Sequence, residues 1–265
     1  MLENLQQLSP KGVASRRPST QLLVSVKNCD EAQLAREMGV AWIDLKNPQA
    51  GSLGAPSLTM ARQVANYLAE FPNRSVALGE LVDLDWLLAR QLAGLFPIAK
   101  VGLSRLLPTP AETVAVNAFA NPSWTQRFVE LARQLAPTQL VPVLYADHSQ
   151  CAAPGPAEIL GMARRISAPF VLIDTFIKDG RTLSSWLSTR QLADLVEAAE
   201  SSGIGVVMAG SLSKADLPDL LPLCPRAIAV RGAVCDSHRT GRLDRSRLQA
   251  WVQLLSRVQP AEKST

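Results

Sequence analysis

Eight short apolar segments recur along the chain, and patterns typical of amphipathic helices stand between them. Short strands that alternate with helices are typical of βαβ units, in which the strands run parallel. Parallel strands need a long crossover, usually a helix, and are covered on both faces. This alternation therefore places the chain in the α/β class. The predicted strands are residues 21–26, 41–46, 75–80, 97–103, 140–145, 170–175, 205–210 and 227–232.

The helical patterns supply the crossovers between these strands. The clearest one follows the sixth strand, where Ser188 and Gln191 form a capping box and Gly203 marks the end of the helix. The predicted helices are residues 30–38, 57–70, 85–94, 124–136, 157–166, 192–200 and 244–258.

Length favours one closed barrel. The chain has 265 residues, and a (β/α)8 barrel needs about 250. No linker of distinct composition interrupts the repeat. We predict a single (β/α)8 TIM barrel over residues 20–258, with a flexible N-terminal extension at 1–19 and a flexible tail at 259–265. An open, doubly wound parallel sheet is the alternative that the alternation leaves open.

Composition narrows the classes of partner. No apolar run approaches the roughly 18 residues of a membrane span, and the N-terminus lacks a signal-peptide core, so we expect a cytoplasmic protein without membrane contact. The net charge of +4 favours anionic ligands. Because no basic run is interleaved with aromatic residues, we expect small anions such as phosphate esters and no nucleic acid. The sequence leaves the oligomeric state open, a homo-oligomer included.

The cysteines and histidines indicate neither a metal site nor a redox pair. The four cysteines show no CxxC spacing, and the two histidines, His148 and His238, are isolated from each other. We therefore expect reduced thiols, no metal ion and no cofactor.

The segment AWIDLKNP raises a question of its own. In an extended chain, Asp44 and Lys46 share one face with Trp42, while Ile43 and Leu45 occupy the other. A surface salt bridge would explain the charged pair without any function, and it would be worth only about 0–1 kcal/mol.

The ends of the other strands favour a functional explanation. Active sites of (β/α)8 barrels lie at the C-terminal ends of the strands. Almost every predicted strand here ends in polar or ionisable residues, and chance surface pairs would not gather at one end of every strand. The residues concerned are Ser25, Asp44, Lys46, Glu80, Lys100, Tyr145, Asp147, Asp174, Lys178, Gly210, Ser211, Arg231 and Gly232.

Three lysines dominate this set. In a barrel, Lys46, Lys100 and Lys178 would converge on one mouth together with Asp44 and Asp174. A single lysine at a strand end would extend its amine into solvent. Three beside two carboxylates predict a site for carbonyl compounds or phosphates, since an amine can form a Schiff base and carboxylates can shuttle protons.

The last two strands predict a phosphate site. AGSL and VRGA place Gly210, Ser211, Gly232 and Ala233 where barrels commonly bind phosphate through backbone N–H groups. Arg231 would add a charged fork. Ordinary turns can also contain such dipeptides, so the prediction depends on their position in the barrel.

A second glycine-rich loop follows the second strand. It contains Gly51, Ser52 and Gly54 and would either cover a second anion or serve as an ordinary connection. Ser25 and Asp147, at the ends of the first and fifth strands, complete the predicted set of substrate-binding residues.

Several of these segments carry a resemblance to a known family. IDLKNPQAGSLGA and IDTFIKDGRTL are the specific ones, and LLVSV, KVGL, YAD, MAGSL, VRGAVC and RTGRLDR follow in the same order, spanning about Leu22 to Arg245. Together they resemble the (5-formylfuran-3-yl)methyl phosphate synthase family. The resemblance implies a (β/α)8 carbon-oxygen lyase that condenses two glyceraldehyde 3-phosphate molecules, with loss of phosphate and water, into the furan precursor of methanofuran.

The resemblance also implies roles for single residues. It makes Lys46 the Schiff-base former, with Asp44, Lys100, Asp174 and Lys178 as the other active-site residues. Our hypothesis is that Asp44 shuttles protons beside Lys46 and that Lys178 and Asp174 act as an acid/base pair. Lys100 would stabilise the negative charge of a phosphate or an enolate.

Two positions and three alternatives stay open. Glu80 stands where the family pattern has an aspartate, and the segment after Asp147 departs from the pattern. Lys178 could form the imine instead of Lys46. The same lysines could serve another class I aldolase or isomerase of small sugar phosphates, and a non-catalytic barrel could bind a phosphate ester.

Overall fold

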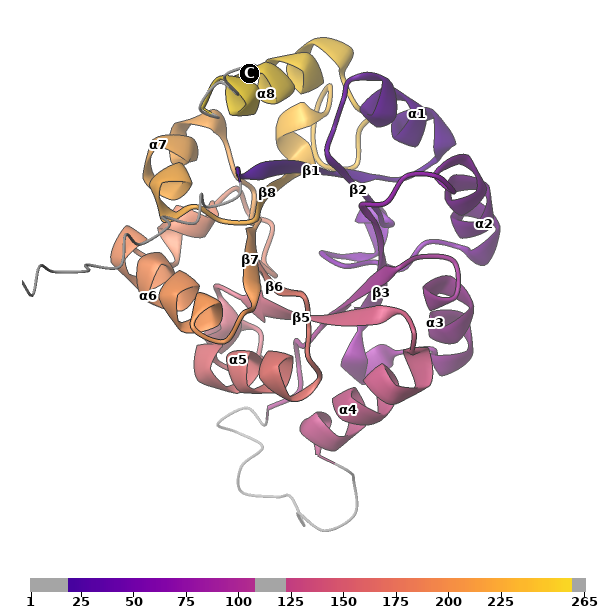
Figure 1. The fold of residues 1–265 in the computed structure, drawn as a ribbon, viewed down its shortest axis with the longest axis vertical. Coiled ribbons are helices and arrows are strands. Elements are labelled where there is room, and N and C mark those ends of the chain that lie inside the picture. The colour runs from indigo at the N-terminus through magenta and orange to yellow at the C-terminus, as the bar shows by residue number, and fades with distance from the viewer. Residues whose placement is uncertain (1–18, 108–122, 259–265) are drawn as a thin grey trace, which may run out of the picture.

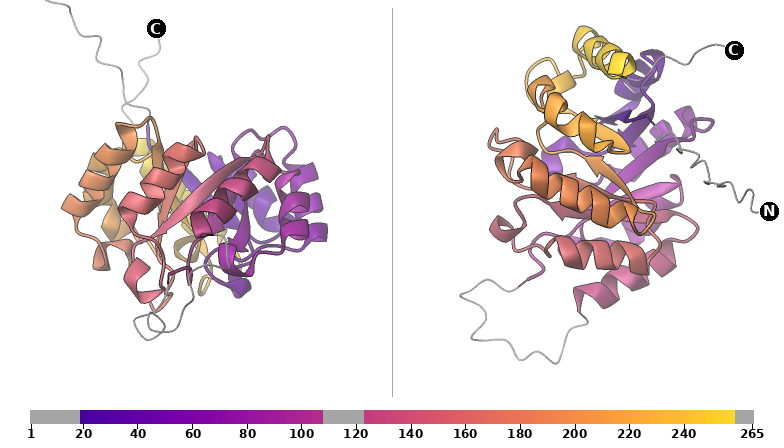
Figure 2. Two further views of the ribbon diagram at one scale, coloured as in Figure 1. Left: turned by 90° about the horizontal axis from the view of Figure 1, so that it is seen from below. Right: turned by 60° about the vertical axis from the view of Figure 1, so that its left-hand side comes forward.

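The computed structural model describes residues 19–107 and 123–258 of the chain. Eight parallel strands close into a barrel in the order β1 to β8, and β8 pairs with β1. The helices form a ring outside the strands, as Figure 1 shows down the barrel and Figure 2 from two other sides. The predicted (β/α)8 barrel is confirmed, and the open sheet is excluded.

All strands and helices lie within the predicted barrel range, and residues 1–18 and the predicted tail at 259–265 lie outside the described residues. The strands are β1 (Gln21–Val26), β2 (Trp42–Leu45), β3 (Arg74–Glu80), β4 (Ile98–Gly102), β5 (Gln139–Tyr145), β6 (Phe170–Asp174), β7 (Gly205–Met208) and β8 (Ala227–Val230). The helices are α1 (Cys29–Glu37), α2 (Leu58–Tyr67), α3 (Trp86–Ala93), α4 (Trp124–Leu135), α5 (Pro156–Arg165), α6 (Thr189–Glu200), α7 (Leu217–Leu220) and α8 (Arg245–Val258).

Side-chain caps determine where several helices begin. The capping box predicted at Ser188 and Gln191 is present at the start of α6, and a second one opens α4 at Ser123. Helix α7 is missing from the sequence prediction. It has four residues, among them Pro218 in its first turn, so it is too short to show a helical period.

The barrel interior changes character along its axis. At its N-terminal end, Trp42 and Phe170 meet edge to face with ring centroids 5.0 Å apart, and the Arg226 guanidinium lies over both rings. Because successive inward positions are two residues apart, the next inward residues on β2 and β4 are Asp44 and Lys100. The interior is therefore apolar at the N-terminal end of the barrel, which we call the floor. It is charged at the C-terminal ends of the strands, which we call the rim.

The second apolar layer lies between the strands and the helices. It is built from the outward strand residues and the inward helix faces, for example Ile43 and Val76 against Val64 and Leu92. The apolar barrel interior and this outer layer pack against the two faces of the strands. Together they fix the strand ends, from which the loops around the site extend.

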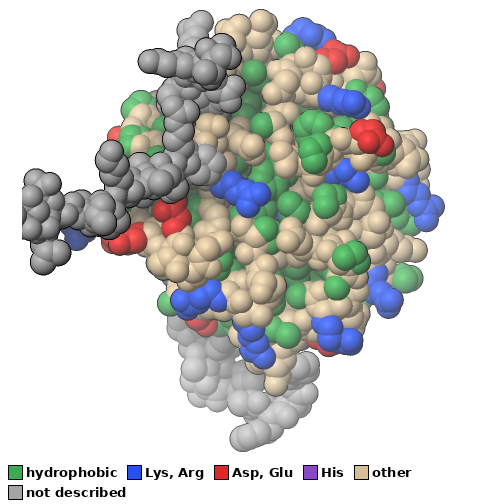
Figure 3. Space-filling model, in the orientation of Figure 1, with side chains coloured by type: hydrophobic (Ala, Val, Ile, Leu, Met, Phe, Trp, Pro, Cys, Tyr) green, Lys and Arg blue, Asp and Glu red, His purple; other side chains and the backbone are tan. Residues whose placement is uncertain are grey.

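On the side of the molecule that Figure 3 presents, Lys and Arg side chains are spread over the surface, with some Asp and Glu side chains among them. Within the described residues, no helix combines the length and apolar character needed to cross a membrane.

The apolar floor generates a stability prediction. Trp42→Ala removes a fully buried ring and should lower the free energy of unfolding by about 3–5 kcal/mol. Urea unfolding followed by far-UV circular dichroism measures the change. Leu87→Ala is the matched control, because Leu87 is 69% exposed and should leave the unfolding midpoint nearly unchanged. Equal midpoints for the two variants would contradict a packed floor.

Candidate active site

A cavity of about 430 Å³ opens at the C-terminal end of the barrel, and Lys46, Lys100, Asp174 and Lys178 all line it. The three lysines come from the ends of β2, β4 and β6, so the convergence expected from their strand positions is present. Of the predicted binding residues, the cavity is also lined by Ser25, Gly210, Ser211, Arg231, Gly232 and Ala233.

Lys46 is the buried amine of this cavity. It follows β2 directly, is 9% exposed, and donates one hydrogen bond of 3.2 Å to the Ser52 carbonyl. No carboxylate lies within ion-pair distance of its amine in the described parts of the chain. Burial lowers the pKa of Lys46 from 10.5 to about 7. Asp174 opposes this shift and Lys178 adds to it.

Asp44 serves Lys100 rather than Lys46. Its carboxylate is fully buried and lies 2.6 Å from the Lys100 amine. It also accepts hydrogen bonds from the hydroxyls of Ser25, at 3.1 Å, and Ser75, at 2.7 Å, which are its neighbours in the strand ladder. The alternative of a surface salt bridge is therefore wrong, and so is the expected pairing of Asp44 with its sequence neighbour Lys46.

Asp174 and Lys178 form the second ion pair, with 2.8 Å between carboxylate and amine. The same oxygen accepts the Thr175 N–H at 2.8 Å, and the Thr175 hydroxyl lies 3.1 Å from the Lys178 amine. Burial alone would raise the pKa of Asp174, but Lys178 and Lys46 outweigh it and hold this pKa below its usual range. The cavity wall thus carries an ionised carboxylate next to an ammonium.

Asp147 positions the segment that bears Lys178. Its two carboxylate oxygens accept the N–H groups of Phe176 and Ile177 at 2.8 and 2.7 Å. Asp147 is buried and is not among the residues that line the cavity. The expectation that it binds substrate is corrected: its oxygens are occupied by the backbone of the β6–α6 loop.

The glycine-rich loop after β2 is pinned to the same segment. The Ser52 hydroxyl lies 3.0 Å from the carbonyl oxygens of both Thr175 and Phe176. At Gly54 a side chain has no room, since a Cβ would come within 2.3 Å of the Asn47 carbonyl oxygen. The loop turns carbonyl oxygens toward cations: Ser52 toward Lys46, and Gly51 toward the Arg239 guanidinium at 2.8 Å. The loop itself therefore binds protein cations; the sequence left open whether it covers an anion or is an ordinary connection.

The ends of β7 and β8 bring the small residues Gly210, Ser211, Gly232 and Ala233 to the cavity wall. Gly210 adopts a φ of +99°, and a Cβ there would lie 3.1 Å from the Thr175 side chain. Gly232 begins a short 3₁₀ turn, η7 (Gly232–Val234), at the cavity wall. The first N–H groups of any helical turn lack partners within that turn and can bind an anion.

Arg231 does not supply the predicted charged fork. All five of its N–H groups are used by protein acceptors: the Glu31 carboxylate twice, and the carbonyl oxygens of Ser25, Arg239 and Gly241. The physical reason is that the buried Glu31 carboxylate pairs with the guanidinium. Together with the three carbonyl oxygens it leaves no N–H donor for a phosphate.

Arg239 is the cavity cation that sequence reasoning missed, and the exposed His238 beside it also lines the mouth. Both lie in the loop between β8 and α8. The segment RTGRLDR was the available signal, because it belongs to the family resemblance and contains Arg239, but its place in the barrel could not be read from strand periodicity.

Glu80 and Tyr145 form a separate contact beside the cavity. The Tyr145 hydroxyl donates to the Glu80 carboxylate, which also accepts the Ser104 N–H at 2.9 Å. Burial and the Glu80 charge raise the pKa of Tyr145 well above its usual value. Neither side chain lines the cavity. No group of three or more His, Cys, Asp or Glu side chains is arranged to hold a metal ion within residues 19–107 and 123–258.

Comparison with known proteins identifies the family. The sequence profile described as 4-HFC-P synthase matches residues 22–252. The chain belongs to the 4-HFC-P synthase family. Members of this family include a (5-formylfuran-3-yl)methyl phosphate synthase from Methanopyrus kandleri, 32% identical over 219 residues that cover 81% of this chain and 89% of that protein. The protein of the same name from Methanothermobacter thermautotrophicus is 28% identical over 242 residues, covering 88% and 98%. The named relatives are synthases, so the chain is an enzyme.

Solved structures with low identity show the fold alone. Phosphoribosyl anthranilate isomerase from Thermus thermophilus superimposes with a TM-score of 0.60 at 15% identity, covering 91% of this chain and all of that one (100%). Thiamine phosphate pyrophosphorylase from Pyrococcus furiosus gives a TM-score of 0.54 at 15% identity, covering 89% and 96%.

The pKa of Lys46 generates a pH prediction. Below about pH 7 its amine is protonated and unreactive; above about pH 7 it is neutral, so its acylation by acetic anhydride should rise with a midpoint near 7. Peptide mass spectrometry of samples labelled at different pH measures this midpoint. Asp174→Asn should move it lower, because Asp174 raises the pKa of Lys46. A midpoint near 10, as for a solvated lysine, would contradict the burial argument.

Proposed function

We propose that this protein is a (5-formylfuran-3-yl)methyl phosphate synthase that condenses two glyceraldehyde 3-phosphate molecules through a lysine Schiff base. The observation that carries the proposal is the buried Lys46 amine, with its pKa of about 7, beside the ionised Asp174 in a cavity lined with further cations. Family membership supports the product, since the named relatives are synthases of this furan.

Ion pairing favours Lys46 over Lys178 as the covalent residue. The Lys100 amine lies 2.6 Å from the Asp44 carboxylate, and the Lys178 amine lies 2.8 Å from the Asp174 carboxylate. Lys46 is buried as well, but the acceptor of its amine is a carbonyl oxygen and not a carboxylate, and burial lowers its pKa to about 7. A nucleophilic amine must be neutral, so Lys46 is the better candidate.

The bond changes balance without an oxidant or reductant. One triose isomerises to its ketone, and the Lys46 amine adds to the carbonyl carbon and expels water to give an imine. Loss of a proton from the adjacent carbon gives an enamine, whose carbon attacks the aldehyde of the second triose. Elimination, ring closure and hydrolysis of the imine free Lys46. In total, two triose phosphates lose one orthophosphate and two water molecules.

The other charged groups have matching tasks. Asp174 lines the cavity and accepts the proton from the carbon next to the imine, while Lys178, at 2.8 Å from it, returns protons to leaving oxygens. Lys100 stabilises the negative charge that develops on substrate oxygen. Asp44 acts through Lys100, which it holds at 2.6 Å. The N–H groups at Gly232 and Ala233 bind one phosphate.

The product assay tests the reaction. Purified protein incubated with glyceraldehyde 3-phosphate alone should produce a furan aldehyde that absorbs in the near ultraviolet, with one phosphate released for each furan formed. Lys46→Arg keeps the charge but cannot form the imine and should abolish turnover. An aldolase or isomerase would convert the triose without furan absorbance, and a non-catalytic barrel would bind it without turnover.

Borohydride trapping tests the covalent residue. Reduction in the presence of substrate should attach one triose-derived group to the peptide that contains Lys46, as read by mass spectrometry. Lys178→Met should slow turnover and still allow trapping at Lys46. An adduct on Lys178, or one that persists in Lys46→Arg, would reverse the two roles, and no adduct under any condition would contradict the imine.

A further inference from the structure

Arg239 is a half-buried cavity cation without a carboxylate partner among the described residues. Its two terminal nitrogens donate to the carbonyl oxygens of Pro48, at 2.7 Å, and Gly51, at 2.8 Å. A guanidinium has five N–H groups, so three remain for another acceptor. Lys100 and Lys178 form ion pairs with Asp44 and Asp174, whereas Arg239 lines the cavity without an ion pair to any described carboxylate.

The position of Arg239 links the two predicted anion sites. Its Cα and Cβ lie 3.8 and 3.6 Å from where a Cβ on Gly232 would stand, so its backbone packs against the turn after β8 for which phosphate binding is proposed. Its side chain then reaches the glycine-rich loop after β2. That loop offers carbonyl oxygens and therefore needs a bound cation before it can accept an anion.

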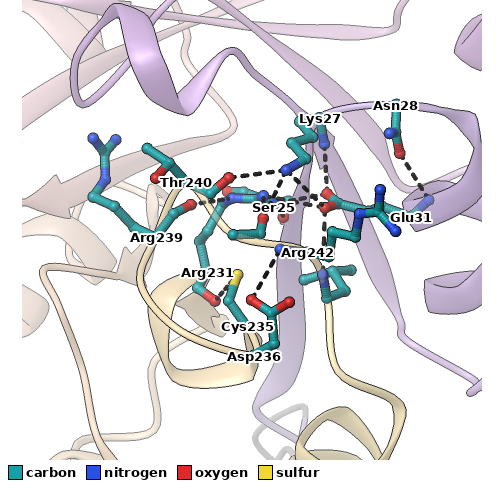
Figure 4. Close-up of polar contacts among 12 residues, drawn as sticks. Ser25, Lys27, Asn28, Glu31, Arg231, Cys235, Asp236, Arg239, Thr240 and Arg242 are labelled. Carbon is teal, nitrogen blue, oxygen red and sulfur yellow. Dashed lines mark hydrogen bonds and ion pairs between the residues drawn. The ribbon is translucent and has the colours of Figure 1, made fainter.

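A buried ion pair fixes the backbone of Arg239. Figure 4 shows the Arg231 guanidinium between Glu31 and the loop, with the Arg239 side chain pointing away from this pair. Arg231 donates to the Arg239 carbonyl at 2.7 Å and to the Gly241 carbonyl at 2.9 Å. Lys27 donates to the Thr240 carbonyl at 2.9 Å and also to that of Gly241.

Glu31 anchors this arrangement. It is 4% exposed, lies 2.6 Å from Arg231, and accepts the N–H groups of Lys27 at 2.8 Å and Leu243 at 3.3 Å. Removing one member of a buried ion pair leaves an uncompensated charge and is costly. Three successive carbonyls of the β8–α8 loop are thus held by cations that Glu31 keeps in place.

We propose that Arg239 binds the phosphate group of a substrate molecule on the β2 side of the cavity, and that the Glu31–Arg231 pair is the device that positions it. Arg239 thus has the phosphate-binding role that the sequence analysis assigned to Arg231. The ligand is a phosphate monoester, because a planar guanidinium with free N–H groups matches phosphate oxygens. The identity of that ester as a triose phosphate rests on the proposed function, and the anion site itself does not.

The test measures binding without turnover. Calorimetry with glycerol 3-phosphate, which has no carbonyl group and cannot form an imine, should show binding that Arg239→Met weakens about tenfold or more. Arg239→Lys should weaken it less, since it keeps the charge and loses the fork. Arg242→Met is the matched control, because Arg242 is an exposed arginine of the same loop. Inorganic phosphate in a parallel titration distinguishes an ester site from a site for the free ion: similar losses for both ligands indicate recognition of the phosphate group alone.

A second set of measurements tests the positioning role of Glu31. Glu31→Gln should also weaken glycerol 3-phosphate binding and raise KM more than it lowers kcat. In the Arg239→Met background, Glu31→Gln should cause no further loss of affinity, because both changes then act on the same contact. Additive losses in the double variant would overturn the positioning role and leave Glu31 as a residue for stability alone.

The outcomes separate this inference from the proposed function. Unchanged affinity for both phosphate ligands in Arg239→Met and Arg239→Lys overturns the inference, whatever the furan assay shows. Arg239-dependent phosphate binding in a protein that makes no furan supports the anion site and overturns the proposed reaction.

Discussion

A closed parallel barrel has one rim at which every strand ends, and the chemistry of this protein depends on that constraint. Closure brings Lys46, Lys100 and Lys178 to a single cavity although they are far apart in the sequence. The barrel beneath them is filled by apolar side chains, with the buried Trp42 ring against Phe170. Desolvation of the Lys46 amine follows from this geometry, and it is the largest influence on its pKa.

The distribution of carboxylates then gives the cations different properties. Asp44 forms an ion pair with Lys100, and Asp174 forms one with Lys178. Among the described residues, no carboxylate forms an ion pair with Lys46, whose pKa is lowered to about 7, or with Arg239, which donates to carbonyl oxygens. Within the described residues, the cavity thus combines lysines that are paired with a carboxylate, Lys100 and Lys178, with cations that are not, Lys46 and Arg239.

The sequence predicted the fold and most of the charged rim correctly, because strand periodicity and strand ends are local properties. Its errors have a common cause. Asp44 was paired with Lys46 and Arg231 was assigned to phosphate, yet their partners are Lys100 and Glu31, which are distant in sequence. Helix α7 was missed because four residues show no period. Arg239 was missed because it lies in a loop, where no repeat indicates which way a side chain points.

What the sequence by itself determined is the alternation of strands and helices, the apolar face of each element, and the presence of ionisable residues at the strand ends. Only the tertiary structure decided which of these groups are paired. Hydrogen bonds and ion pairs at the rim join residues from different strands and loops, and their formation depends on distances of a few ångströms across the barrel. The lowered pKa of Lys46 and the bonding of the Arg239 guanidinium to carbonyl oxygens instead of a carboxylate are features of that tertiary arrangement.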